Sequence, residues 1–381
     1  MSLTILTNVR IVTAEEDFVG TITFDETGIV DISSGKTSAA GAEDGEGDLC
    51  IPGLIEMHTD NVEKHLEPRP GVSWPSSIAA LLAHDTQMVG AGVTTVYDAI
   101  SVGDYEEDGR RNALLNKTVE GIKYGTQHGL FRAEHMMHMR CEVCDAAVVD
   151  MFQPLANDPV VRLVSLMDHT PGQRQWRDLS KMKQFHSKRR TYTDEELEEF
   201  VAIRLAKQMK YADKHRQQII DLWRPRGLPM ASHDDTTPEH IEAAVREGIH
   251  IAEFPTTIEA AQLASEAGMR NVMGSPNLVR GGSHSGNVSA KELADNGILH
   301  ALSSDYMPIS LLHAAVKLNE EHDYTLANAI ATVTKNVADM LSLHDRGELK
   351  VGKRADIVKF KRVGDGSAAV STVYRQGVRV L

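Results

Sequence analysis

The chain has 381 residues, of which 41% are hydrophobic and 25% charged, and this composition excludes a disordered chain, a collagen and a coiled coil. Its 40 basic and 54 acidic residues give a net charge of −14, the wrong sign for a protein that holds nucleic acid or an anionic membrane across its whole surface. Three cysteines against 17 histidines argue against a disulfide framework and predict that any bound metal is held by imidazole and carboxylate groups.

The opening residues lack the basic and apolar regions of an export signal, and no apolar run approaches the roughly 18 residues that a membrane span needs. We therefore expect a cytoplasmic protein that contacts neither membrane nor nucleic acid. The first 50 residues predict short strands at 3–12 and 18–24, followed by a surface loop at 33–48. They contain ten acidic and two basic residues, so this segment accounts for −8 of the net charge.

From residue 53 onward, short apolar segments alternate with helical ones. The segments that predict strands are 53–58, 92–98, 130–142, 160–168, 228–234, 250–254, 271–274 and 301–305. The expected helices between them are 77–89, 194–223, 238–247, 257–266 and 309–343, and a capping box of Thr193 and Glu196 introduces the second. Eight strand and helix alternations predict an α/β fold, a (β/α)8 TIM barrel, with a doubly wound sheet as the alternative.

The tail of the chain returns to strand composition at 355–360 and 373–380. A discontinuous β-sandwich domain, formed by residues 1–52 and 345–381, explains this pattern if residues 53–344 form the barrel. Two unrelated terminal additions are the alternative.

Histidines and acids recur at the predicted carboxyl ends of the strands, where TIM barrels place their active sites. The first strand ends near His58 and Asp60, which share a face because strand side chains alternate with a period of two. They could hold one cation together. The candidates on later strands are Glu142, Asp168, His169, His233, Asp234, His250, Glu253 and Asp305.

Two motifs that bracket most of the chain resemble the metal-dependent amidohydrolase superfamily: PGLIEMH at 52–58 and GELKVGKRADIV at 347–358. The resemblance implies a (β/α)8 barrel, a small β-sandwich from both termini, and one or two divalent metals that activate a water. The chain departs from the commonest superfamily pattern, because Asp60 replaces the second histidine of the first strand and no lysine lies near 160–169. We therefore expect Glu142 to bridge the metals.

Five further stretches, at 58–64, 68–75, 168–173, 232–235 and 252–257, resemble a narrower branch of that superfamily. It is the α-D-ribose 1-methylphosphonate 5-triphosphate diphosphatase family of phosphonate metabolism, in the carbon-phosphorus lyase pathway. This resemblance implies hydrolysis between the first and second phosphates, which yields ribose 1-methylphosphonate 5-phosphate and pyrophosphate.

The charge distribution supports an anionic substrate. Residues 171–190 contain seven basic side chains and one acid, and guanidinium groups make bidentate contacts to phosphate oxygens. A solvated loop without a ligand is the alternative. The predicted substrate-binding residues are Lys64, Arg69, His169, Arg174, Arg177, Lys188, Arg189, Arg190, Arg280 and His284.

The predicted metal ligands are His58, Asp60, Glu142, His233, Glu253 and Asp305, with His250 competing at strand six and Asp168 or His169 at strand four. Asp305 is also the predicted catalytic base. Zinc is the first expectation for the one or two ions, and Mn²⁺, Fe²⁺ or Ni²⁺ suit the same ligand types. The expected partner is a small phosphorylated sugar, and the oligomeric state stays open. The alternatives are an amidohydrolase that cleaves a C–N bond, in an N-acyl amino acid or a cyclic amide, and a metal-free, non-catalytic scaffold.

Overall fold

The computed structural model describes residues 3–69, 71–104, 109–176, 179–180, 182, 193–283, 286–364 and 366–381. The chain forms two compact units. Unit 1 comprises Met1–Asp98, Gly121–Met136 and His300–Leu381, and unit 2 comprises Ala99–Glu120 and Met137–Leu299. The predicted domain boundaries at 52/53 and 344/345 stay a prediction.

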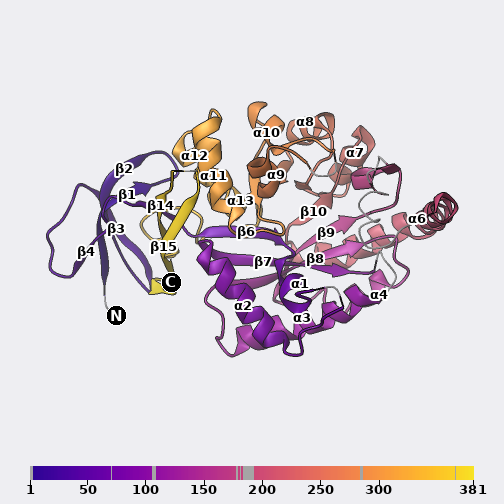
Figure 1. Ribbon diagram of the computed structural model, residues 1–381, viewed down its shortest axis with the longest axis horizontal. Coiled ribbons are helices and arrows are strands. Elements are labelled where there is room, and N and C mark those ends of the chain that lie inside the picture. The colour runs from indigo at the N-terminus through magenta and orange to yellow at the C-terminus, as the bar shows by residue number, and fades with distance from the viewer. Residues whose placement is uncertain are drawn as a thin grey trace. The chain divides into compact units, whose positions relative to one another are not determined.

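Strands from both ends of the chain form one mixed sheet within unit 1, as predicted, and Figure 1 shows the indigo N-terminal strands beside the yellow C-terminal ones. Its order is β16 (Val378–Arg379), β15 (Ala368–Arg375), β14 (Ile357–Arg362), β5 (Leu49–Pro52), β1 (Thr4–Val12), β2 (Asp17–Asp25), β3 (Gly28–Ser34), with β4 (Ala42–Asp44) paired to β1. Alternating apolar side chains of these strands form a buried core, in which the rings of Phe24 and Tyr374 meet edge to face with centroids 4.9 Å apart.

The two motifs that carry the superfamily resemblance are adjacent in this sheet. Pro52 at the end of β5 pairs with Ile357 of β14, and the Gly53 N–H donates to the carbonyl of Asp356 at 2.8 Å. A Cβ at Gly53 would collide with the Thr94 side chain, so only glycine fits this crossing. The two distant motifs therefore form one structural joint, where the terminal sheet meets the first strand of the barrel.

The second sheet has eight strands in sequential order, which confirms all eight predicted strands. The order is β6 (Leu54–Thr59), β7 (Val93–Val102), β8 (Glu134–Glu142), β9 (Val161–Met167), β10 (Met230–His233), β11 (Ile251–Glu253), β12 (Arg270–Gly274), β13 (Ala301–Ser303). A parallel bridge between Thr59 and Asp305 links the two edges, so the sheet is a nearly closed barrel. The doubly wound alternative is wrong, because such a sheet reverses its strand order at a switch point.

Helices alternate with the barrel strands in chain order (Figure 1). They are α1 (Asn61–Leu66), α2 (Ser77–Gly90), α3 (Arg110–Gln127), α4 (Val148–Phe152), α6 (Asp194–Trp223), α7 (Pro238–Arg246), α8 (Ile258–Glu266), α9 (Ser275–Arg280), α10 (Ala290–Asp295), α11 (Ser310–Glu321), α12 (Leu326–Ala331) and α13 (Lys335–Met340). The capping box of Thr193 and Glu196 is present at the start of α6.

Two local expectations are wrong. Residues 309–343 form three helices rather than one, because the Thr325 side chain accepts a hydrogen bond from the Asn328 N–H and caps a new start. The expected loop at 33–48 contains β4, which pairs in parallel with β1.

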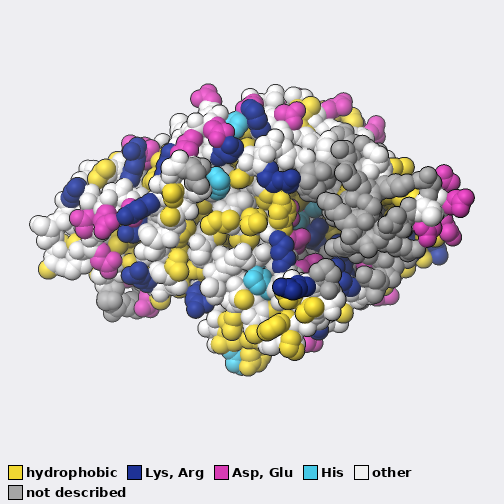
Figure 2. Space-filling view, viewed as in Figure 1, with side chains coloured by type: hydrophobic (Ala, Val, Ile, Leu, Met, Phe, Trp, Pro, Cys, Tyr) yellow, Lys and Arg dark blue, Asp and Glu magenta, His cyan; other side chains and the backbone are white. Residues whose placement is uncertain are grey.

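The surface of α6 is acidic at its start, where Glu195, Glu196, Glu198 and Glu199 are exposed. Figure 2 shows these acidic side chains gathered over that helix. Within the part of the chain that the structure describes, no helix combines the length and the apolar character needed to cross a bilayer.

Candidate metal centre

Four acidic or imidazole side chains lie at the carboxyl ends of successive strands in unit 2. Glu142 ends β8, His169 follows β9 by two residues, His233 ends β10 and Glu253 ends β11. All four are buried. His233 and Glu253 are direct register partners of two parallel strands, so the sheet itself places them side by side.

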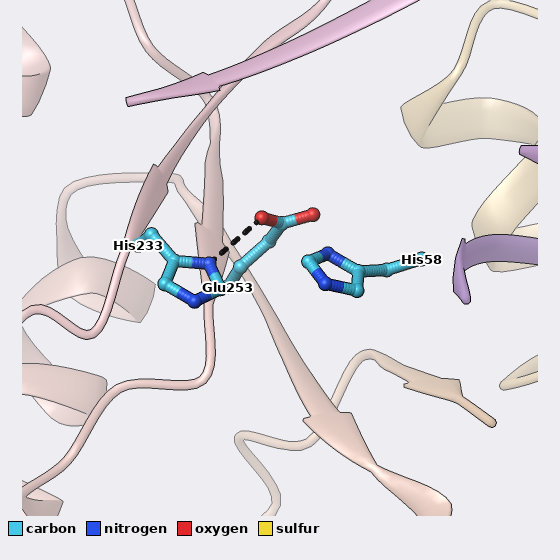
Figure 3. Close-up of side chains that lie close together, drawn as sticks. All are labelled: His58, His233 and Glu253. Atoms are coloured by element: carbon cyan, nitrogen blue, oxygen red, sulfur yellow. Dashed lines mark hydrogen bonds and ion pairs between the residues drawn. The ribbon is translucent and has the colours of Figure 1, made fainter. Parts of the chain in front are cut away.

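Each of the two imidazoles lies between two carboxylates. His169 Nδ1 is 2.6 Å from Glu142 Oε2, and His233 Nδ1 is 3.2 Å from Glu253 Oε2, the contact drawn in Figure 3. The Nε2 atoms of His169 and His233 lie 3.9 and 3.5 Å from Asp234 Oδ2. Donor atoms of His169, His233 and Asp234 lie within 4.8 Å of one another, as the ligands of a metal ion do.

Asp234 is a strand-end candidate that the predicted ligand set does not include. Its Oδ2 atom is buried and has no hydrogen-bond partner among the described residues. Burial raises the pKa of Asp234 to about 7, although the charges of His169 and Arg174 oppose that rise. A buried carboxylate oxygen without a donor is costly unless another group, such as a cation, satisfies it. Asp234 therefore belongs among the candidate ligands.

Three residues that follow the carboxyl ends of barrel strands have a strained backbone. Asp234, Phe254 and Asp305, which follow β10, β11 and β13, have φ values of 56°, 55° and 52°. The left-handed region costs a non-glycine residue on the order of 1–3 kcal/mol and persists where the surroundings impose it, often at functional sites. The sequence carries no signal of this strain, because none of the three positions is a glycine.

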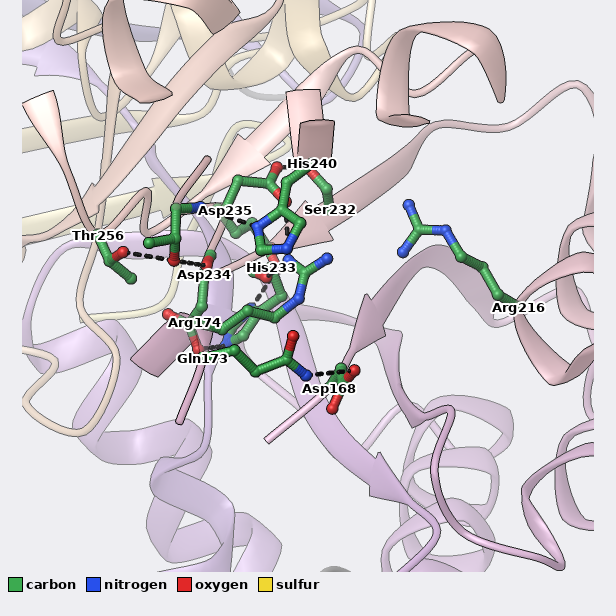
Figure 4. Close-up of polar contacts among 12 residues, drawn as sticks. Asp168, Gln173, Arg174, Arg216, Ser232, His233, Asp234, Asp235, His240 and Thr256 are labelled. Atoms are coloured by element: carbon green, nitrogen blue, oxygen red, sulfur yellow. Dashed lines mark hydrogen bonds and ion pairs between the residues drawn. The ribbon is translucent and has the colours of Figure 1, made fainter. Parts of the chain in front are cut away.

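A buried polar network holds the end of β10 (Figure 4). The Arg174 guanidinium donates to the His233 carbonyl at 2.7 Å and to Asp235 Oδ1 at 2.8 Å. Ser232 Oγ donates to the other carboxylate oxygen of Asp235. Arg174 is buried, so these contacts orient His233; a contact between Arg174 and a substrate stays a prediction.

Asp168, the competing ligand at strand four, has both carboxylate oxygens occupied by donors. Oδ1 accepts from the Thr170 N–H at 3.0 Å and from Cys144 Sγ at 3.2 Å. Oδ2 accepts from the amides of Gln173 at 2.7 Å and Gln208 at 2.8 Å. His169 is therefore the better ligand candidate at this strand.

In unit 1, Glu56 joins the ends of the first and last barrel strands. Its Oε1 accepts from the His58 N–H at 2.7 Å and from Ser303 Oγ at 2.9 Å, and its Oε2 accepts from the Ser304 N–H at 2.6 Å. The side chain is fully buried, and burial raises the pKa of Glu56 to about 7 against the hydrogen bonds that lower it.

Asp60 and Asp305, two predicted ligands, are joined through the backbone. The Asp305 carbonyl accepts from the Asp60 N–H at 3.2 Å and from Thr59 Oγ1 at 2.7 Å. Among the described residues, Asp60 Oδ1 is another buried oxygen without a hydrogen-bond donor. Lys64 donates to the Tyr306 carbonyl and lies 4.9 Å from the centroid of the Tyr306 ring.

A second buried group in unit 1 consists of His84, Asp98 and His135. Asp98 accepts from His84 Nε2 at 2.7 Å and from His135 Nδ1 at 2.8 Å, while His135 Nε2 lies 3.3 Å from Asp85 Oδ1. Two ligands that are each ~2.1 Å from one ion stand roughly 3.0–3.4 Å apart. The shorter distances here are those of hydrogen bonds, so this group is a buried polar network. By the same measure the contact of 2.6 Å between His169 Nδ1 and Glu142 Oε2 is a hydrogen bond, which leaves His169 Nε2 and Glu142 Oε1 as the atoms that would face an ion.

The remaining predicted residues divide into two sets. Lys64, Arg69 and Arg280 are exposed, as is His250, which precedes β11 and leaves Glu253 as the residue at the end of that strand. The others lie outside the described residues; these are Arg177, Lys188, Arg189, Arg190 and His284.

Comparison with known proteins agrees with this architecture. Residues 177–380 match the family model described as the amidohydrolase family. The chain is 42% identical over 378 residues to an alpha-D-ribose 1-methylphosphonate 5-triphosphate diphosphatase of Escherichia coli strain K12, with 99% of this chain and all of that protein covered.

Solved structures share the fold at low identity. An N-acetylglucosamine-6-phosphate deacetylase from Pasteurella multocida superposes with a TM-score of 0.67 at 12% identity, with 99% of both chains covered. A dihydropyrimidinase from Brevibacillus agri superposes with a TM-score of 0.63 at 13% identity, covering 100% of this chain and 95% of that one.

Proposed function

Because the chain belongs to the amidohydrolase family and has a diphosphatase homologue along its whole length, we propose that it hydrolyses α-D-ribose 1-methylphosphonate 5-triphosphate to the 5-phosphate and pyrophosphate in phosphonate catabolism. The full-length identity is the observation that carries this proposal, since it spans the terminal sheet, the barrel and every predicted ligand. Water attacks the first phosphorus, and the bond to the departing pyrophosphate breaks.

The described residues fit one or two divalent ions. Asp60 Oδ1 and Asp234 Oδ2 are buried oxygens that lack a hydrogen-bond donor, and a cation would satisfy them. The 3.2 Å between His233 Nδ1 and Glu253 Oε2 agrees with the roughly 3.0–3.4 Å expected between two ligands of one ion. The 3.5 Å between His233 Nε2 and Asp234 Oδ2 belongs to the other ring nitrogen, which would bind a different ion.

We assign the ions to residues at the carboxyl ends of the barrel strands. The proposed ligands of unit 1 are His58, Asp60 and Asp305, and those of unit 2 are Glu142, His233 and Glu253. His169 and Asp234 join them as further candidates. Mixed nitrogen and oxygen ligands favour zinc, and Mn²⁺, Fe²⁺ and Ni²⁺ suit the same types.

A bound divalent ion would lower the pKa of a coordinated water towards neutrality and offset negative charge on phosphate oxygens. The side chains perform the remaining steps. Asp305 accepts the proton of the attacking water, and its carbonyl contacts with Thr59 and Asp60 hold its backbone in place. The exposed cations Lys64 and Arg69 bind phosphate oxygens, together with the basic segment at 177–190.

The test is an assay of the purified protein, supplied with Zn²⁺ or Mn²⁺, against ribose 5-triphosphates, N-acyl amino acids and cyclic amides. Pyrophosphate, orthophosphate and amine are detected separately. We expect one pyrophosphate per triphosphate consumed and no amine. Release of amine alone would move the activity to a C–N bond, and a purified chain that retains no metal and is inert on every substrate would be a scaffold.

A further inference from the structure

Glu56 is a fully buried acid between the first and last barrel strands, and no predicted ligand set includes it. We propose that Glu56 is a positioning residue: its carboxylate ties the end of β6 to the end of β13, and so sets where His58 and Asp305 present their ligand atoms. This inference rests on the proposed metal-dependent function.

The contacts come from both strands and reach both oxygens. The His58 N–H donates to Oε1 and the Ser304 N–H donates to Oε2, so one side chain accepts from the backbone of each strand. The single proton of Ser303 Oγ lies within hydrogen-bond distance of both Oε1 and the His58 carbonyl, so the two acceptors share it. The backbone of His58 is therefore held at its N–H by Glu56 and at its carbonyl by Ser303.

The same joint reaches the residue proposed as the base. Asp305 directly follows Ser304, and its own N–H donates to Ser303 Oγ at 3.2 Å. Asp305 has the left-handed backbone described above, which the surrounding contacts must impose. Those contacts include the hydrogen bond from the Asp305 N–H to Ser303 Oγ. Glu56 in turn holds Ser303 and Ser304, the two residues before Asp305.

A carboxylate is the group that this joint requires. Two N–H donors approach two different oxygens, and the amide of glutamine has only one oxygen. In Glu56→Gln the amide NH₂ faces one of the two backbone donors, whichever way it turns, so one strand loses its acceptor. A buried donor without an acceptor is destabilising, so the strand end shifts to find another partner.

The experiment compares Glu56→Gln with Asp356→Asn in the full chain. Asp356 is a matched control because it is a buried acid of the same unit that accepts a backbone N–H, from Gln376 at 2.9 Å, and it lies beside Gly53 at the opposite end of β6 from His58. Zn²⁺ affinity is measured by titration of the metal-stripped protein, Tm is measured without metal, and pyrophosphate release is measured with excess Zn²⁺.

We expect both variants to lower the metal-free Tm, whereas only Glu56→Gln weakens Zn²⁺ binding, by tenfold or more, and lowers kcat more than it raises KM. Zn²⁺ affinity within twofold of the native protein in a folded Glu56→Gln would overturn the proposal, as would an equal loss of affinity in Asp356→Asn. If Glu56→Gln does not fold, Ser303→Ala removes the hydroxyl that links Glu56 Oε1 to the His58 carbonyl and the Asp305 N–H, and an unchanged Zn²⁺ affinity there overturns the proposal.

The two proposals fail differently. If the native chain binds Zn²⁺ and Glu56→Gln weakens that binding, the positioning role stands even when no triphosphate is hydrolysed. If pyrophosphate is released and Zn²⁺ affinity does not respond to Glu56, the proposed function stands and the positioning role is wrong.

Discussion

Asp305 is the residue on which the proposed proton transfer depends. Asp305→Asn keeps the size of the side chain and removes its basicity, so we expect pyrophosphate release to fall by about 10²–10⁴-fold. The measurement is kcat for a ribose 5-triphosphate with metal in excess. Asp295→Asn, on an exposed helical acid, is the control and should leave the rate unchanged. A rate within a few-fold of the native value for Asp305→Asn would remove it as the base.

Arg174 and Asp235 form a buried ion pair that holds His233. Arg174→Leu leaves the Asp235 carboxylate buried without its cation, so we expect the free energy of unfolding to fall by about 3–5 kcal/mol. Arg174→Leu combined with Asp235→Leu should recover part of that loss, because neither charge is then left alone. Urea denaturation measures both. If the free energy of unfolding of Arg174→Leu lies within ~1 kcal/mol of the native value, the pair stabilises the fold no more than an exposed ion pair does.

Which site residues could be predicted depends on what a residue's type reveals. The position of His58, Glu142, His233 and Asp305 at the strand ends was predictable, because histidines and acids recur at alternate positions where the strands end. Their roles as ligands stay a prediction. Arg174 was read as a phosphate ligand because its charge is visible, whereas its burial against Asp235 is not. The place of Asp234 at a strand end was visible in the sequence, but its left-handed backbone was not. The contacts of Glu56 are long-range hydrogen bonds, which leave no local pattern.

At the scale of elements, α2, β7 and β8 are joined by the buried network of His84, Asp98 and His135. Burial alone would lower the pKa of His135, but the charge of Asp98 and hydrogen bonds to Asp85 and Asp98 raise it to about 9. A pKa raised in the folded state gives stability that is fully present below the ordinary value near 6.5 and is lost as the pH rises through about 9.

We therefore expect the free energy of unfolding to fall by up to about 3 kcal/mol between pH 6.5 and pH values above 9. His135→Gln cannot gain the proton, so its stability should lack this decline. The measurement is urea denaturation over a pH series, with His128→Gln, an exposed histidine, as the control. Parallel pH profiles for the native chain and His135→Gln would contradict the prediction.

Barrel strands were predictable because each is an apolar run bounded by turn residues, and all eight are present. Residues 309–343 were predicted as one helix because their apolar spacing continues through the breaks. The breaks between the helices depend on the Thr325 cap and on residues 332–334, whose N–H groups donate to the carbonyls three residues earlier. Local hydrogen bonds therefore end the helices although the apolar spacing continues past these points. The apolar spacing alone does not predict the helix ends.

At the scale of the molecule, the joint between the terminal sheet and the barrel depends on Gly53. Gly53→Ala places a methyl group against Thr94 and Asp356, so we expect overpacking to lower the free energy of unfolding by ~1–3 kcal/mol. Gly90→Ala is the matched control, because a Cβ there meets open space at the end of α2. Thermal denaturation compares the two, and an equal Tm for both variants would contradict the packing argument.

The pairing of β5 with β14 also determines when the protein can finish folding during synthesis. About 300 residues separate the two strands, so at ~5–20 residues per second the ribosome needs roughly 15–60 s to supply the second after the first. Throughout that interval the edge of β5 has no partner to accept and donate its hydrogen bonds. The newly made N-terminal segment is thus open to aggregation and to chaperone binding until the last tenth of the chain emerges.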